Sequence, residues 1–424
     1  MYKAISAADA VKVVKSNDRV YLQAAAAVPQ ELINALTDRH EELRNVEICH
    51  LHIEGETPYA DPKYRESFQV NSLFIGPNVR HTIKAGNGTY TPVFLSEVPL
   101  LFKRNILPVD VAFIHVSTPD KHGYLSLGVS IEATLAVIQN AKHVIALVNE
   151  QMPRVHGEGI IHISEIDTFV EINRPIPNFH IPIPTEVDDK IGKYIAELIE
   201  DRSTLQMGIG SIPNAVLSKL KNHKDLGIHT EMFSDGVIDL ILDDVINGNH
   251  KKVSPGRAMT TFLAGSQRLY DYVDDNPFIE MRSCDYVNDT SIIKQNPRTV
   301  AINSAIQVDV TGQVCADSIG SNMYSGVGGQ MDFIRGASLS EGGKAIIALP
   351  SRTSKGVSRI VASLYPGAGV VTTRSHVQYI ITEYGVANLY GRSIKDRVKA
   401  LVNIAHPDDR EMIDRQYFEQ TRFD

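Results

Sequence analysis

Two stretches of this chain repeat the same pattern, and the repeat constrains the fold more than any other feature. The first begins Asp18-Arg-Val-Tyr-Leu-Gln23 and reaches a helix-forming run from Pro29 to Leu36. The second begins Asp201-Arg-Ser-Thr-Leu-Gln206 and reaches a similar run from Pro213 to Leu220. In both, a short apolar strand leads through a turn into a helix that starts at proline. Chance similarity of two βα units is the alternative, but we favour a duplicated α/β domain.

A proline-rich segment separates the two halves. Pro175, Pro177, Pro182 and Pro184 favour an extended connector because proline cannot continue a helix or a central strand. With 424 residues, two domains are expected, and we place them at residues 1–186 and 187–424.

The periodicity of apolar residues predicts strands alternating with helices, which indicates mainly parallel sheets. The expected strands, besides those of the repeat, are 46–53, 109–116, 143–148, 228–231, 300–302, 344–349, 369–373 and 377–382. The expected helices are 7–16, 29–38, 188–200, 213–222 and 393–404.

Composition excludes several classes of protein. No uncharged apolar run is long enough to span a membrane, and Lys12 and Lys15 interrupt any signal peptide. The net charge of -8 argues against nucleic acid as a partner. The three cysteines have neither metal-ligand nor disulfide spacing, which fits a reducing cytoplasm.

Glu231 is the strongest candidate for catalysis. It follows a short apolar run, and the residues after it have helical spacing. In an open α/β sheet the carboxyl end of a strand faces the ligand crevice. A carboxylate there can act as a general base or as a nucleophile. The alternative is an acid in a surface loop.

Two glycine-rich segments could present backbone N–H groups to an anion. One is the turn Gly208-Ile209-Gly210-Ser211-Ile212, which leads into the helix at Pro213. It is not a dinucleotide fingerprint, because Pro213 stands where the third glycine belongs, and no P-loop lysine follows. The other is Ser325-Gly-Val-Gly328-Gly329, where successive N–H groups can point at one oxyanion. An ordinary flexible loop is the alternative.

Histidines suggest two further readings that we disfavour. His229 with Ser234 and Asp235 could form a hydrolase triad, but all three crowd one turn and no nucleophile elbow surrounds the serine. His115, His122, His156 and His162 lack the spacing of zinc ligands, so we expect no metal site.

The chain resembles the acetyl-CoA hydrolase/transferase family nearly from end to end, most closely its 4-hydroxybutyrate and butyryl-CoA:acetate CoA-transferases. The motifs that carry the likeness are Asp120–Ser130, Ile160–Asp167, Gly208–Asn214, His229–Met232, Tyr286–Asp289, Gly326–Phe333, Gly342–Ser351 and the ending Val370–Ala387. The resemblance implies two similar open α/β domains with the active site where they meet, the acid substrate on the N-terminal side, and the catalytic glutamate and CoA on the C-terminal side.

By this resemblance Glu231 is the nucleophile, which forms an acyl anhydride and then a glutamyl-CoA thioester. Backbone N–H groups of Gly208–Ile212 and Gly328–Gly329 supply CoA contacts and the oxyanion site, and Asn288 lies near the glutamate. Asn288 could equally be a helix cap or turn residue. The acid pocket would draw on Gln23 and residues 86–97. Lys344, Lys355, Arg335, Arg352 and Arg359 are candidates for the CoA phosphates, although a run of charges is more often a solvated face.

These residues predict a CoA-transferase with ping-pong kinetics. CoA is then a substrate, no prosthetic group is needed, and the partners are an acyl-CoA and a short-chain acid such as 4-hydroxybutyrate, butyrate or acetate. The resemblance also implies a homodimer or homotetramer. An acyl-CoA hydrolase, in which water replaces the second acid, and a non-catalytic CoA-binding module are the alternatives. The exposed nucleophile argues against the latter, because binding alone does not need one.

Overall fold

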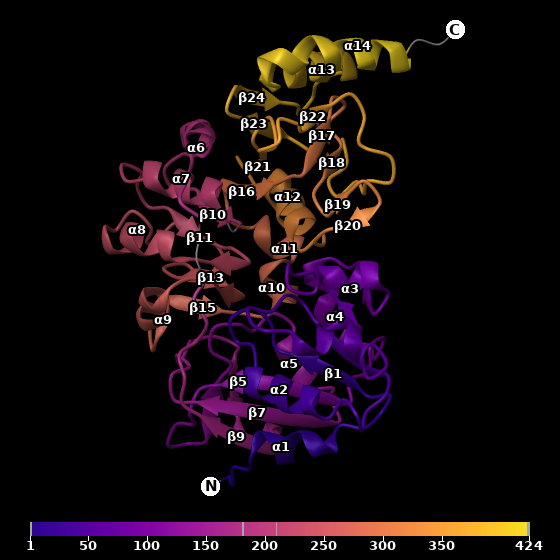
Figure 1. Cartoon of the computed structure of the whole chain (residues 1–424). Coiled ribbons are helices and arrows are strands. Elements are labelled where there is room, and N and C mark those ends of the chain that lie inside the picture. Colours follow the sequence, from indigo (N-terminus) through magenta and orange to yellow (C-terminus); the bar gives the residue numbers. More distant parts are fainter. Residues whose placement is uncertain (1, 180–181, 209, 422–424) are drawn as a thin grey trace. The chain divides into compact units, whose positions relative to one another are not determined.

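The computed structural model describes residues 2–179, 182–208 and 210–421 (Figure 1). The chain forms two compact units. The N-terminal unit contains Met1–His180, Glu231–Asp235 and Met259–Val287, and the C-terminal unit contains Ile181–Thr230, Gly236–Ala258 and Asn288–Asp424. No helix of the described ranges is long and apolar enough to cross a bilayer.

The N-terminal unit is built on a seven-stranded parallel sheet. Its spatial order is β4-β3-β2-β1-β5-β7-β9. The inner strand β5, next to the central strand β1, is buried along its whole length, as expected for a parallel sheet covered on both faces. The strands are β1 (Arg19–Leu22), β2 (Val46–His50), β3 (Phe68–Ser72), β4 (Gly88–Tyr90), β5 (Val111–Val116), β7 (His143–Asn149) and β9 (Thr168–Ile172). The helices are α1 (Ala7–Ala10), α2 (Gln30–Asp38), α3 (Arg80–Ala85), α4 (Val98–Lys103) and α5 (Thr134–Ile138), and β6 (Tyr124–Ser126) pairs with β8 (Ile160–His162).

Residues from the second half of the sequence complete this unit. Strand β12 (Met232–Phe233) pairs in parallel with β14 (Phe262–Leu263), and β13 (Ala258–Thr260) pairs with β15 (Ile279–Met281). Helices α9 (Gln267–Val273) and α10 (Cys284–Val287) follow. The proline-rich connector packs on this segment: Phe179 N donates to Gly265 O at 2.9 Å and the Tyr270 hydroxyl donates to Pro177 O at 2.8 Å.

The C-terminal unit has a six-stranded sheet of order β11-β10-β16-β21-β23-β24, parallel except for β24. Its strands are β10 (Thr204–Met207), β11 (Gly227–Ile228), β16 (Thr299–Ser304), β21 (Lys344–Ala348), β23 (Tyr379–Thr382) and β24 (Gly385–Asn388). Smaller pairings join β17 (Gln307–Asp309) to β18 (Val314–Cys315) and β22 (Ile360–Val361), and β19 (Ser318–Ile319) to β20 (Asn322–Met323).

The helices of this unit include the pair α6 (Glu186–Leu198) and α7 (Ser211–Lys219), which pack closely. Gly192 allows the approach, because a Cβ there would lie 2.9 Å from the Ala215 backbone. The others are α8 (Ile238–Leu242), α11 (Thr290–Ile293), α12 (Gln330–Leu339), α13 (Ile394–Ile404) and α14 (Arg410–Thr421). Figure 1 shows α13 and α14 together at one end of the C-terminal unit.

The two similar parallel-sheet units expected from the repeat are confirmed. Strand β1 lies between β2 and β5, and β10 occupies the same place between β11 and β16. Most of the expected elements form within a few residues of their predicted bounds, but the helix expected at 7–16 is α1 followed by a 3-10 turn at Val11–Val13. The strand expected at 369–373 is wrong: only Thr372 makes an isolated bridge, to Val314.

The compact units differ from domains divided at residues 186 and 187. Glu231–Asp235 and Met259–Val287 belong to the N-terminal unit, although they follow the connector in sequence. The cause is strand pairing, since β12 and β14 pair with each other and Leu263 N donates to Val129 O at 2.8 Å. Glu231 is therefore carried by the N-terminal unit and not by the sheet of the C-terminal unit.

Candidate active site

Glu231 lies between β11 and β12, and its backbone is tightly held. Its carbonyl oxygen accepts hydrogen bonds from Thr260 Oγ1 at 3.0 Å, Thr261 N at 3.0 Å and Phe262 N at 3.1 Å. The residue as a whole is half-buried. The helix expected directly after it begins later, because β12 intervenes before the turn at Asp235 and α8. Three donors on one carbonyl fix the main chain from which the carboxylate projects.

An apolar cluster follows Glu231 in the N-terminal unit. Met232 packs with Ala25, Phe262 and Ala264, and Phe179 of the connector covers the cluster. Burial of these side chains stabilises the position of β12 and β14. Strand β12, which begins just after Glu231, is therefore held both by its backbone pairing with β14 and by the packing of its side chains.

Gln23, expected in the acid pocket, has a different role. It is fully buried, its Nε2 donates to Leu127 O at 3.0 Å and to Ser130 O at 2.7 Å, and its Oε1 accepts from His115 N at 2.6 Å. The amide is thus engaged within the protein. We therefore interpret Gln23 as a structural brace at the end of β1.

The glycine-rich turn predicted after β10 is described on both sides of Ile209. Gly210 has φ +136°, a conformation that favours glycine, and α7 begins directly after it at Ser211. Gly208 N, however, donates to Ile302 O at 3.3 Å, as a continuation of the β10–β16 pairing. Of the expected backbone donors, Gly208 is therefore already engaged, Ser211 and Ile212 lie in the first turn of α7, and Ile209 lies outside the described residues.

The second glycine-rich turn also starts a helix. Gly328 has φ +56° and Gly329 precedes α12. The Gln330 side chain donates to Ser304 O at 2.7 Å, which ties α12 to the carboxyl end of β16. Asn288 is fully buried and donates to Asp332 Oδ2 at 3.4 Å in the first turn of the same helix. The structure thus brings Asn288 and the Gly328–Gly329 turn to one helix, through an aspartate that sequence reasoning missed.

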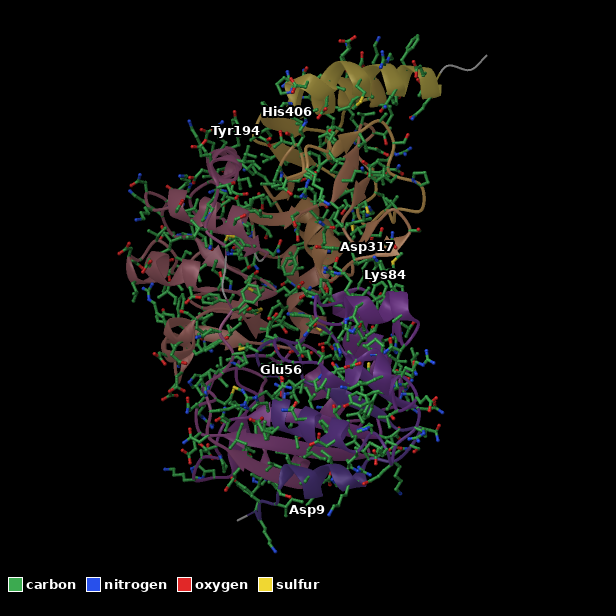
Figure 2. All side chains as sticks on the ribbon, in the orientation of Figure 1. Asp9, Glu56, Lys84, Tyr194, Asp317 and His406 are labelled. Atoms are coloured by element: carbon green, nitrogen blue, oxygen red, sulfur yellow. The ribbon has the colours of Figure 1, made fainter. Side chains whose placement is uncertain are left out.

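A cavity of about 900 Å³ lies in the C-terminal unit. Its walls include Ser304 at the end of β16, Tyr324, Tyr365, Lys355 and Arg359. Asp317, labelled in Figure 2, stands in the turn between β18 and β19, next to the wall residues Ala316 and Ser318. The cavity is large enough for part of a nucleotide-containing ligand.

Arg359 gives this cavity a cation. Its Nη1 donates to Ala305 O at 3.2 Å, and its buried Nε has no hydrogen-bond partner among the described residues. Burial lowers the pKa of the guanidinium from its ordinary value, because desolvation disfavours the charged form. A bound anion would offset that cost and satisfy the Nε donor.

The structure separates the five basic candidates. Lys344 pairs with Glu200 at 2.6 Å, Arg352 pairs with Asp409 at 2.6 Å, and Arg335 is exposed on α12. Lys355 and Arg359 line the cavity. Those two are therefore the basic residues placed to meet an anionic ligand there.

The disfavoured triad is not assembled. His229 is buried and hydrogen-bonds through Nδ1 to Asn296 at 3.1 Å, whereas Asp235 accepts from the hydroxyl and the backbone of Ser266. His229 and Asp235 therefore each bond to a residue that is distant in sequence from Ser234.

An α/β protein with these glycine turns and this acid matches known families along most of its length. The acetyl-CoA hydrolase/transferase N-terminal domain matches residues 1–179, and the acetyl-CoA hydrolase/transferase C-terminal domain matches residues 265–417. The chain therefore belongs to the acetyl-CoA hydrolase/transferase family.

Similar proteins span nearly the whole chain. The 4-hydroxybutyrate coenzyme A transferase of Clostridium kluyveri is 48% identical over 98% of this chain and 97% of its own length. The succinyl-CoA:acetate/propanoyl-CoA:succinate CoA transferase of Fasciola hepatica is 46% identical over 96% of this chain and 86% of its own. The crystal structure of RipA from Yersinia pestis superimposes with a TM-score of 0.93 at 34% identity, covering 99% of this chain and 97% of RipA.

Proposed function

We propose that this protein is a CoA-transferase that moves CoA between a short-chain acyl-CoA and a carboxylic acid, with Glu231 as the covalent nucleophile. The observation that carries the proposal is the position of Glu231, a half-buried residue whose main-chain carbonyl is held by three donors. The similarity to named CoA-transferases over nearly the whole chain supports it.

The chemistry needs only a carboxylate and preorganised donors. The Glu231 carboxylate attacks the thioester carbonyl, the C–S bond breaks, and the CoA thiolate leaves an acyl-glutamyl anhydride. The thiolate then attacks the glutamyl carbonyl, the first acid departs, and a glutamyl-CoA thioester remains. The incoming acid repeats these steps in reverse. Each step preserves the activated acyl bond, so no external energy source is consumed.

The oxyanions of these steps require N–H donors aimed at the reacting carbonyl. We assign this role to the backbone at Gly210–Ile212 and Gly328–Gly329, with the Asn288 side chain as a third contributor. Gly208 is left out of the set because its N–H already bonds to Ile302.

We assign the CoA phosphates to the cavity lined by Lys355 and Arg359. Phosphate oxygens suit a guanidinium with an unsatisfied N–H. Because the relatives are named for different acids, 4-hydroxybutyrate in one and succinate in another, the choice between 4-hydroxybutyrate, butyrate and a dicarboxylic acid is a matter for assay.

The test is a panel of carboxylates with acetyl-CoA as donor. We expect acetyl-CoA loss that requires an added acid, with formation of the new acyl-CoA and parallel initial-rate lines. Exchange of labelled acetate into acetyl-CoA should occur without a second acid. Acetyl-CoA loss at the same rate without any acid would instead identify a hydrolase, and neither loss nor exchange would identify a binding module.

A further inference from the structure

Glu132 has a buried carboxyl group that takes no part in the proposed chemistry, and a short series of hydrogen bonds connects its turn to Glu231. Glu132 is 1% exposed. Its Oε1 accepts from the Ser130 hydroxyl, and its Oε2 accepts from Thr134 Oγ1 at 3.1 Å, Ala133 N at 3.3 Å and the Tyr21 hydroxyl at 3.5 Å. The side chain thereby draws residues 130–134 into one tight turn.

The backbone of Glu132 is held in an unfavourable conformation. Its φ of +27° is positive, a backbone conformation that residues other than glycine rarely adopt. The carbonyl accepts from Ser283 Oγ at 2.9 Å and from Cys284 N at 3.0 Å. Strain of this kind persists where surrounding contacts over-determine the geometry, and it is concentrated at functional sites.

Two further contacts connect this turn to Glu231. Ile131 N donates to Thr261 O at 3.0 Å, and Thr261 N donates to Glu231 O at 3.0 Å. On the neighbouring residues, Ser130 forms an antiparallel bridge with Phe262, and Phe262 N also donates to Glu231 O. Glu132 is therefore two backbone hydrogen bonds away from the carbonyl of the proposed nucleophile, and all of these residues belong to the N-terminal unit.

We propose that Glu132 is a positioning residue for Glu231: its carboxyl group shapes the 130–134 turn, and this turn fixes the 260–262 segment that holds the Glu231 main chain. The proposal rests on the role of Glu231 as nucleophile. A carboxylate that must attack a bound thioester needs its backbone placed to a fraction of an ångström. The four donors on Glu132 and the three on the Glu231 carbonyl provide that placement.

Within the part of the chain that the structure describes, Glu132 forms no ion pair that could offset its burial. Tyr21 on β1 bonds to the carboxyl, and Cys49 on β2 and Cys284 on α10 are the other titratable groups that act on Tyr21; all three are fully buried. Burial raises the pKa of the Glu132 carboxyl to about 7, against the lowering effect of its hydrogen bonds. An apolar residue would avoid that cost, so packing alone does not account for a carboxyl group here.

The test compares Glu132→Ala with Glu132→Gln, which keeps an oxygen acceptor for the hydroxyl donors. Thr37→Val is the matched control, since it removes one buried hydroxyl bond of the same unit, from Thr37 to Ile33 O at 2.9 Å, outside this chain of contacts. Measured are kcat and KM for acetyl-CoA, and the single-turnover rate at which CoA becomes attached to the enzyme. Thr134→Val, which removes one donor, replaces Glu132→Ala if that variant does not fold.

We expect Glu132→Ala to lose about tenfold to hundredfold in kcat and in the rate of CoA attachment, the loss typical of a small misplacement of a reacting group. Its KM for acetyl-CoA should stay near that of the wild type. Glu132→Gln should retain most of the rate, and Thr37→Val should lose stability only. Wild-type attachment kinetics in Glu132→Ala would overturn the positioning role.

Glu231→Ala separates this inference from the proposed function. An active Glu231→Ala enzyme would show that Glu231 is not the nucleophile, and would overturn the proposed function together with this inference. An inactive Glu231→Ala enzyme together with a fully active Glu132→Ala enzyme would leave the proposed function intact and overturn only the role of Glu132.

Discussion

Replacing Glu132 by glutamine should change how the stability of the protein depends on pH. The wild-type carboxyl is fully buried and is met by three hydroxyl groups and one backbone N–H. Glutamine has nearly the same shape but carries no charge at any pH. Since hydroxyl groups can accept as well as donate, Ser130 and Thr134 can turn to meet the new amide.

The magnitude follows from the pKa of Glu132, which burial raises from 4.5 to about 7. Between pH 4.5 and about pH 7, the folded state therefore keeps a proton on Glu132 that the unfolded state has already released. The corresponding stability is fully present below pH 4.5 and is lost as pH rises through 7. At about 1.4 kcal/mol for each pKa unit, this amounts to about 3 kcal/mol. Glu132→Gln should lack that loss.

The assay is denaturant unfolding of both proteins across this pH range, followed by a probe in the N-terminal unit. We expect the free energy of unfolding of Glu132→Gln, relative to the wild type, to rise by about 3 kcal/mol between pH 4.5 and pH 8. The difference cancels the titration of groups that both proteins share. A difference that stays constant with pH would refute the reasoning, as would a change of opposite sign.

Three other outcomes follow from the site. Arg359→Met should raise KM for acetyl-CoA about tenfold to hundredfold with little change in kcat, the cost of one charged hydrogen bond. The control Arg352→Met, which breaks an ion pair, should lower thermal stability without raising KM. An equal rise of KM in both variants would contradict the assignment of CoA to this cavity. Gly265→Ala should lower the melting temperature of the N-terminal unit, because a Cβ would contact the Asp235 carboxylate and would lie 2.6 Å from Leu269; an unchanged melting curve would argue against this packing. Initial-rate lines for two substrates should be parallel, and intersecting lines would contradict a covalent intermediate.

The repeat, the periodicity of apolar residues and the family resemblance together predict two similar units with mainly parallel sheets. Apolar strands and the helix-forming runs that contain Pro29 and Pro213 are local signals, and local signals are readable in sequence, although α7 begins at Ser211, two residues before the expected start. The error at residues 369–373 has the opposite cause. Val370 and Val371 have strand-forming side chains, but only Thr372 finds a strand partner, and partners cannot be read from one segment alone.

The site was predictable in part. Glu231 and the two glycine turns could be proposed from sequence, because glycine and acidic residues at strand ends have a direct physical meaning, whereas Asn288 is proposed from the family resemblance; the roles of all of them stay predictions. The assignment of Glu231 to the N-terminal unit could not be predicted, since it depends on the hydrogen bond from Phe262 N to the Glu231 carbonyl and on the bond from Leu263 N to Val129 O, which join residues distant in sequence. Arg352 and Arg359 are equally basic in sequence, and the structure separates them: Arg352 pairs with Asp409, whereas Arg359 lines the cavity.

The measurement that tests the central claim most directly is the identification of the residue that carries CoA. Enzyme mixed with acetyl-CoA in the absence of an acceptor acid should form a glutamyl-CoA thioester, which borohydride reduces to an alcohol with loss of activity. Peptide mass spectrometry should locate the change at Glu231, enzyme treated without acetyl-CoA should keep its activity, and Glu231→Ala should show neither labelling nor exchange. Modification at another residue, or a Glu231→Ala enzyme with more than about a tenth of the wild-type rate, a barrier change near 1.4 kcal/mol, would contradict the mechanism.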